Sequence, residues 1–337
     1  MTFRQSAART AGFAALYLLA TYAGRLTVMD ATNLSLVWPA AGVLSVWFVV
    51  QRGSRWRWLD VLALVGITML VNMATGSSAA LAAFFVVANV VQALVFAYLA
   101  ARWLPSFQSG RHGVPALSRL RELWRLIAAA GLATASGALI GPTGVWLVSG
   151  TYGWQTTVVW LTRNTVSVLL VGVAILRVGH LFYHWWLRRH EPGIGTAWWR
   201  ALPVVKRLEY AALVASSLAA YCVAFGLGDG LPVAFAVISV TVWAGLRMHT
   251  TFVILHDLSF GSIAILFTLH GDGPFAMIES HAVRALIAQL FVGMVAVVGL
   301  ALALSRDERD RLTTELRAQA QLMTTIVDTL SEGISVV

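Results

Sequence analysis

The feature that most constrains this chain is a series of ten predominantly apolar stretches separated by short polar segments. The stretches cover residues 8–29, 34–50, 59–74, 79–101, 123–149, 155–176, 208–227, 231–246, 250–269 and 283–304. About 20 apolar residues in a helix cross the ~30 Å hydrocarbon core of a bilayer. The sequence therefore predicts an all-α fold, a polytopic transmembrane helical bundle of about ten spans. The two shortest stretches, 34–50 and 231–246, are expected to be tilted spans or re-entrant segments.

Composition and charge support a membrane location. Only 12% of the 337 residues are charged, whereas soluble domains carry roughly 25%. So little charge leaves too few groups to cover a water-exposed surface, and the surplus apolar side chains must face lipid. The single cysteine, Cys222, excludes an intrachain disulfide. The net charge of +9 comes from basic residues placed between the apolar stretches, which indicates contact with membrane lipid rather than nucleic acid.

The basic residues also predict the orientation of the chain. If the N-terminus is cytoplasmic and every stretch crosses the membrane, nearly all of the 24 Lys and Arg residues fall in cytoplasmic segments. Arg25 and Arg284 are left outside, and Arg163 lies within a stretch. This positive-inside pattern predicts a multi-pass protein of the bacterial inner membrane with both termini in the cytoplasm.

The C-terminal tail changes character at Ser305, where a strongly charged segment begins. Apolar residues then recur in a heptad pattern, with one polar residue among them: Leu312, Gln319 and Ile326 are seven apart, and Leu316, Met323 and Leu330 follow at an offset of four. Such spacing is typical of a coiled coil. We predict that residues 305–326 form a coiled-coil signalling linker that pairs with a second copy of the chain. The alternative is a single amphipathic helix on the membrane or on its own protein.

Arg163 is the most informative charged residue because it lies inside an apolar stretch, with Trp160 and Asn164 close by in the sequence. A charge at membrane depth costs at least ~2.5–3.5 kcal/mol, so Arg163 is expected to face the interior of the bundle and find a partner. Arg163 is therefore a candidate contact for a ligand or an ion, or one member of a switchable ion pair. The alternatives are a structural ion pair and a side chain that extends to the interface.

His256 and Asp257 form a second polar site, inside the stretch 250–269. We predict that Asp257 pairs with Arg163, because pairing opposite charges offsets the cost of desolvation. A titratable histidine beside a carboxylate is also placed to respond to pH. Alternatively, the two residues cap a helix beneath a cytoplasmic loop.

No catalytic constellation is visible in the sequence. The chain lacks a Gly-rich phosphate loop, a nucleophile elbow, a histidine-kinase phosphoacceptor box and a cyclase motif of the GGDEF type. His180 and His184 share a helix face, but two ligands without a third favour an interfacial belt over a metal site. The sequence therefore predicts no catalytic residue and no metal ligand, and it leaves any cofactor unknown.

The second stretch opens with Trp38-Pro39-Ala-Ala-Gly42. Pro39 suits the first turn of a helix, and Gly42 allows close approach of a second helix. The residues alone indicate a packing motif, and we also include Trp38 and Pro39 among the candidate ligand or switch residues.

Four motifs in this order resemble those of a known family, the membrane-associated sensor (MASE) domain of the first type. They are Trp38-Pro39-Ala-Ala-Gly42, which resembles its WPxxG opening, Trp243-Ala-Gly-Leu-Arg247, which resembles the end of a later helix, Gly271-Asp-Gly-Pro-Phe275, which resembles an outer loop, and Gln289-Leu-Phe291, which resembles the last span. The resemblance covers most of residues 34–304. The chain departs from the family at Arg163-Asn164, where an acidic pair is common.

The resemblance implies signal input rather than catalysis, because such modules precede histidine kinases and diguanylate cyclases. It implies a MASE-like sensor domain at 1–304, recognising an unknown small ligand or a membrane partner protein. Residues 327–337 resemble the first helix and strand of a PAS domain, which suggests a piece of a longer receptor. The alternatives are a transporter or channel with a polar site at the middle of the membrane, and a membrane-embedded enzyme.

Overall fold

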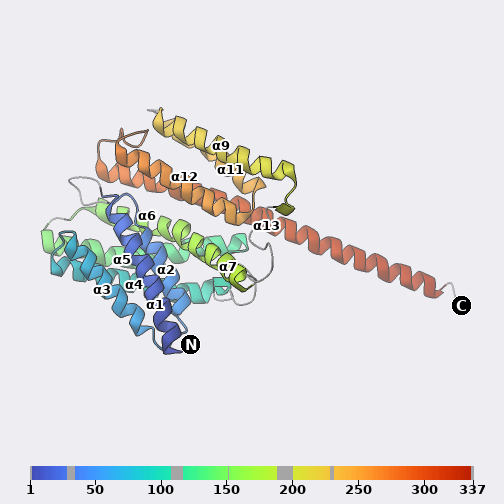
Figure 1. Ribbon diagram of the computed structural model, residues 1–337, viewed down its shortest axis with the longest axis horizontal. Helices are drawn as coiled ribbons and strands as arrows, with labels where there is room; N and C mark the ends of the chain where they lie inside the picture. Colours follow the sequence, from blue (N-terminus) through green and yellow to red (C-terminus); the bar gives the residue numbers. More distant parts are fainter. Residues whose placement is uncertain are drawn as a thin grey trace.

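The computed structural model describes residues 2–28, 35–107, 117–150, 152–187, 200–227 and 231–334 (Figure 1). The α-helices in chain order are α1 (Phe3–Arg25), α2 (Pro39–Gln51), α3 (Trp58–Ala74), α4 (Ala79–Trp103), α5 (Leu120–Ser149), α6 (Trp154–Ser167), α7 (Val173–Leu187), α9 (Val204–Gly226), α10 (Leu231–Ala236), α11 (Ile238–Arg247), α12 (Thr250–His270) and α13 (His281–Ile334). A 3₁₀ turn, η1 (Pro105–Phe107), follows α4, and a π-helical turn, η2 (Val168–Gly172), joins α6 to α7. Within these ranges no β-strand forms, so the all-α prediction is confirmed.

Every apolar stretch of the sequence contains a helix, and six helices in the described part of the chain are long and apolar enough to cross a membrane. By length and composition these are Ala79–Trp103, Leu120–Ser149, Trp154–Leu187, Val204–Gly226, Thr250–His270 and the first part of α13. Three apolar helices are shorter, namely Pro39–Gln51, Trp58–Ala74 and Val233–Arg247. The chain is therefore a polytopic membrane protein, whereas the total of ten crossings stays a prediction.

The helices pack around two hydrophobic cores. The first joins α1–α5 and includes Trp47, Leu64, Phe96 and Leu126. The second joins α9, α11, α12 and α13 and includes Tyr221, Phe225, Phe275 and Phe291. In Figure 1, α9, α11 and α12 lie along the first part of α13, and α1–α5 lie on the other side of α6. Because η2 supplies Val168 and Leu169 to the first core and Leu170 to the second, it lies at the seam between the two groups of helices.

The short helix α2 is a core helix, and all but two of its 13 residues are buried. It crosses η2 at very close range. A Cβ added at Gly42 would lie 2.5 Å from the carbonyl oxygen of Ser167 and 2.8 Å from the amide nitrogen of Gly172. The Gly42 amide also donates a hydrogen bond to Ser167 Oγ, at 3.0 Å. Backbone contact with η2 therefore explains why Gly42 occupies this position.

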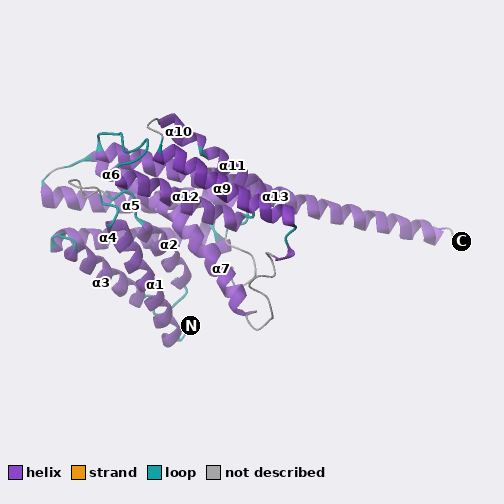
Figure 2. Cartoon of the chain, turned by 45° about the horizontal axis from the view of Figure 1, so that its top comes forward, coloured by secondary structure: helices purple, strands orange, loops and turns teal. Residues whose placement is uncertain are grey.

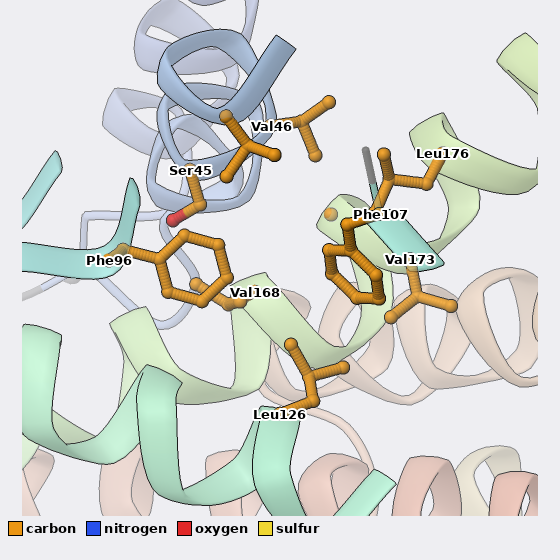
Figure 3. A pocket seen from close by; sticks show the side chains of 10 residues that line it. Ser45, Val46, Phe96, Phe107, Leu126, Val168, Val173 and Leu176 are labelled. Atoms are coloured by element: carbon orange, nitrogen blue, oxygen red, sulfur yellow. The ribbon is translucent and has the colours of Figure 1, made fainter. Parts of the chain in front are cut away.

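A small apolar cavity of about 10 Å³ lies where α2, α4 and α5 meet η2 (Figure 3). Phe96, Phe107, Leu126 and Val168 turn their side chains toward it. A π-helical turn is rare and occurs mostly as a single turn inside an α-helix, as η2 does between α6 and α7. A void this small and this apolar stays dry.

The last helix, α13, runs 54 residues without a break and leaves the bundle as a single rod (Figures 1 and 2). The predicted linker 305–326 is therefore helical. No separate element begins at residue 327, since the helix continues to Ile334, and this continuity does not support the predicted start of a PAS domain there. The strand predicted at the end of the chain and the side chain of Leu330 lie outside the described residues.

Candidate functional site

Arg163 is held between two tryptophan rings. Its guanidinium carbon lies 5.0 Å from the ring centroid of Trp160, three residues earlier on α6, and 5.2 Å from that of Trp38, which precedes α2. Its Nη1 donates a hydrogen bond to Ser35 Oγ at 2.6 Å. Cation–π contact with two rings partly replaces the water that the guanidinium loses. The structure therefore brings together three of the predicted site residues, with Pro39 next to Trp38. We call Trp38, Trp160 and Arg163 the stacked-arginine site.

Two glycines make this stacking possible. A Cβ at Gly24, on α1, would lie 2.7 Å from the ring of Trp38, and one at Gly141, on α5, would lie 2.8 Å from the ring of Trp160. Each indole therefore rests directly on helix backbone. This close approach anchors α1, α2, α5 and α6 around one charged side chain.

Asn164 extends the polar site toward α4. It is fully buried, and its Nδ2 donates to Gln92 Oε1 at 3.0 Å. Its Oδ1, together with Gln92 Nε2, Trp160 Nε1 and Arg163 Nε, is buried without a hydrogen-bond partner among the described residues. Buried polar atoms usually have partners, so these atoms leave unused capacity to bind a polar group.

His256 and Asp257 form a separate site in the second core. His256 Nδ1 lies 2.9 Å from Asp257 Oδ1, and its Nε2 lies 2.9 Å from Ser217 Oγ on α9. Asp257 is 1% exposed, and its Oδ2 points at Gly299 of α13, where an added Cβ would collide with it. This buried pair therefore connects α9 and α12 to the exit helix.

The predicted ion pair between Arg163 and Asp257 is wrong. Arg163 contacts Ser35 and the two tryptophans, whereas the carboxylate of Asp257 contacts His256. The reason is depth in the bundle. Val166, one turn beyond Arg163 on α6, sits on Gly293 of α13, whereas Asp257 sits on Gly299, six residues further along the same helix. We therefore expect no rescue from exchanging the two charges.

A third cluster, which the sequence analysis missed, lies where α13 leaves the bundle. Arg306 Nη1 donates to the carbonyl oxygens of Gly245, at 3.4 Å, and Met248, at the end of α11. We call Arg306, Asp307 and Glu308 the exit clamp. The arginine satisfies carbonyl groups that the end of a helix leaves without partners, and a positive charge is favourable there.

The two acidic residues of the exit clamp bind the starts of two other helices. Asp307 Oδ2 accepts a hydrogen bond from Thr250 Oγ1, the first residue of α12, at 2.5 Å. Glu308 Oε2 accepts from the amide of Leu120, the first residue of α5, at 3.3 Å. His249 precedes Thr250, and burial lowers the pKa of its ring, which favours the neutral form. In that form His249 Nδ1 accepts a hydrogen bond from the Thr251 amide.

The only sequence signal for the exit clamp was three charged residues that follow the last apolar stretch.

Beyond the exit clamp, the predicted coiled-coil face is open to solvent. Leu312, Leu316, Met323 and Ile326 are 48%, 66%, 64% and 46% exposed in the single chain. The described residues place no other part of the chain over this stripe.

Comparison with known proteins identifies the chain by its family. Neither the curated proteins nor the solved structures contain a match. The family model MASE1 matches residues 10–310, which include both cores, the stacked-arginine site and the exit clamp. The match covers most of the chain and agrees with the resemblance of the four motifs. The protein therefore belongs to the MASE1 family of membrane-associated sensory domains of signalling receptors.

Proposed function

We propose that this chain is the input module of a bacterial receptor of the histidine kinase or diguanylate cyclase type, and that α13 carries its signal out of the membrane. The observation that carries the proposal is the continuity of α13. One helix packs against Asp257 at Gly299, binds the ends of three other helices through the exit clamp, and continues as an exposed rod. The helix would carry the signal to an output region on the cytoplasmic side of the inner membrane.

The stacked-arginine site is the proposed point of input. Three buried donor atoms at and beside this site have no partner among the described residues, on Arg163, Trp160 and the neighbouring Gln92, which suits a small ligand or a partner protein that offers acceptor oxygens. A route to α13 exists in the packing, because Val166 sits on Gly293 of that helix, where an added Cβ would lie 2.8 Å from Val166 Cγ2. Val166 lies about one turn after Arg163 on α6, so a movement of Arg163 would be passed to the exit helix α13 through Val166.

The exit clamp provides the test of this function. The chain is fused ahead of a cyclase or kinase output domain, and Asp307→Ala is compared with Asp310→Ala, three residues further on and exposed. A hydrogen bond to a charged group is worth about 1.5–3 kcal/mol. Loss of the Thr250 contact should therefore change the balance between two packings, and the basal output, by about tenfold.

The control variant should leave the basal output unchanged within about twofold, since a surface ion pair contributes little. Equal outputs from the two variants would show that the exit clamp does not transmit, and the proposed input function would fail with it.

We further propose that the exposed stripe of α13 pairs with the same stripe of a second chain. Single cysteines at Leu312, Leu316 and Met323, in a Cys222→Ser background, should cross-link strongly under mild oxidation. Cysteines at Arg317 and Gln321 should not, because they lie off the a and d positions of the heptad. The native Cys222 is exposed and must be removed first. Uniform cross-linking along the helix would contradict a parallel dimer.

A further inference from the structure

A basic groove lies between the end of α4 and the start of α5. It is lined by Arg102 and Trp103 of α4 and by Arg121, Trp124, Arg125 and Ala128 of α5, and its volume is about 480 Å³. This volume is within the range of small-molecule sites, about 300–1,000 Å³. The three guanidinium groups are exposed, so the groove is open to whatever surrounds the protein.

The three arginines keep their charge available. Among the described residues none of the three forms an ion pair, and their one hydrogen bond there runs from Arg125 Nη1 to the Trp103 carbonyl oxygen, at 3.3 Å. Two carboxylates at the start of α5 are engaged elsewhere, with Glu122 accepting a hydrogen bond from the Ser118 amide and Glu308 accepting one from the Leu120 amide. The segment 108–116 between the two helices contains no acidic residue. The groove is therefore a concentrated positive site.

The groove sits at the membrane boundary. It occupies the ends of two long apolar helices, α4 and α5, and tryptophans mark the depth of lipid headgroups. Leu120, at the first turn of α5, is bound to Glu308, so the groove lies at the same end of the bundle as the exit of α13.

An apolar strip continues from the groove along the same two helix faces. On α4, Tyr98 and Leu94 lie one and two turns from Arg102 and are 60% and 45% exposed. On α5, Leu132 follows Ala128 by one turn and is 53% exposed. A free phosphate ion would use only the arginines, whereas a phospholipid would use the arginines and the strip together.

We propose that this groove binds the headgroup of an anionic phospholipid, with the phosphate on the three arginines, the polar backbone of the lipid against the tryptophans, and one acyl chain along the apolar strip. Arginine suits this role because its planar fork gives paired hydrogen bonds to phosphate oxygens. Basic clusters at helix ends attract anionic lipid in general. In this groove the apolar strip and the tryptophans add contacts for the rest of the lipid, so the basic cluster becomes a binding site with a defined shape.

The test uses the full chain in detergent, titrated with dioleoylphosphatidylglycerol or dioleoylphosphatidylcholine, with bound lipid counted by native mass spectrometry. The groove variant carries Arg102→Gln, Arg121→Gln and Arg125→Gln. The control variant carries Arg52→Gln, Arg55→Gln and Arg57→Gln, three exposed arginines between α2 and α3. The groove variant should bind phosphatidylglycerol at least about tenfold more weakly, and the control variant should change by less than about twofold.

Three results would overturn the proposal. These are equal affinity of the unaltered chain for the two lipids, equal losses in the two triple variants, and displacement of phosphatidylglycerol by millimolar inorganic phosphate, which would show a free-anion site. If the groove variant does not fold, Arg121→Gln alone should still weaken binding by at least about threefold, and an unchanged affinity would refute the site. The triple Arg→Lys variant should bind more tightly than the groove variant but more weakly than the unaltered chain, since lysine keeps the charge and loses the paired hydrogen bonds.

Discussion

Replacing Trp160 by alanine is expected to lower the free energy of unfolding by about 3 kcal/mol. Truncating a buried tryptophan in a soluble core costs about 3–5 kcal/mol. The lower end applies here because the unfolded chain stays in an apolar phase, so that lost packing accounts for most of the loss. Trp160 is 7% exposed, lies against Gly141, and packs on Phe85 in a tilted arrangement with ring centroids 5.6 Å apart. The loss is measured by reversible unfolding in mixed micelles.

The matched control is Trp154→Ala, in the first turn of the same helix, where the side chain is 60% exposed. It should cost less than about 0.5 kcal/mol, as other exposed substitutions do. A second variant, Trp160→Phe, keeps a ring over Arg163 and should recover more than half of the stability. If alanine at 160 and at 154 cost the same, Trp160 would not support the stacked-arginine site.

Alanine at Gly42 is expected to destabilise the bundle by about 2 kcal/mol. The added Cβ would lie 2.5 Å and 2.8 Å from backbone atoms of Ser167 and Gly172, so α2 must move away from the π-turn. Overpacking of this kind typically costs about 1–3 kcal/mol. The same unfolding assay measures it, and the loss of the Gly42–Ser167 hydrogen bond should accompany it.

Gly66→Ala is the control for this substitution, because Gly66 lies inside α3 and, among the described residues, the added Cβ would meet no atom within 4 Å beyond its chain neighbours and the adjacent backbone of its own helix. There the gain in helix propensity should stabilise the protein by about 0.5–1 kcal/mol. The two glycines should therefore move stability in opposite directions. A stabilising effect at Gly42 would mean that α2 does not contact η2 as closely as the structure shows.

The sequence was least informative where function depends on contacts between distant segments. It identified Trp38, Trp160 and Arg163 as candidates, but it assigned Arg163 the wrong partner. A charge in an apolar stretch shows that a partner is needed, and the partner depends on depth and rotation, which hydropathy does not encode. The exit clamp was missed for the same reason: Arg306, Asp307 and Glu308 read as solvated charges until the free helix ends of α5, α11 and α12 are seen beside them.

By itself the sequence determined the class of the protein, the positions of its helices and the charged character of the exit helix. These follow from local properties, since about 20 apolar residues in a membrane have to close their own backbone hydrogen bonds as a helix. Only the tertiary structure decided that α2 is a buried core helix, that a π-turn receives Gly42, and that α13 is bound to three helix ends as it leaves the bundle. Such contacts depend on which helix faces which, and that choice is made by the packing of side chains far apart in the chain.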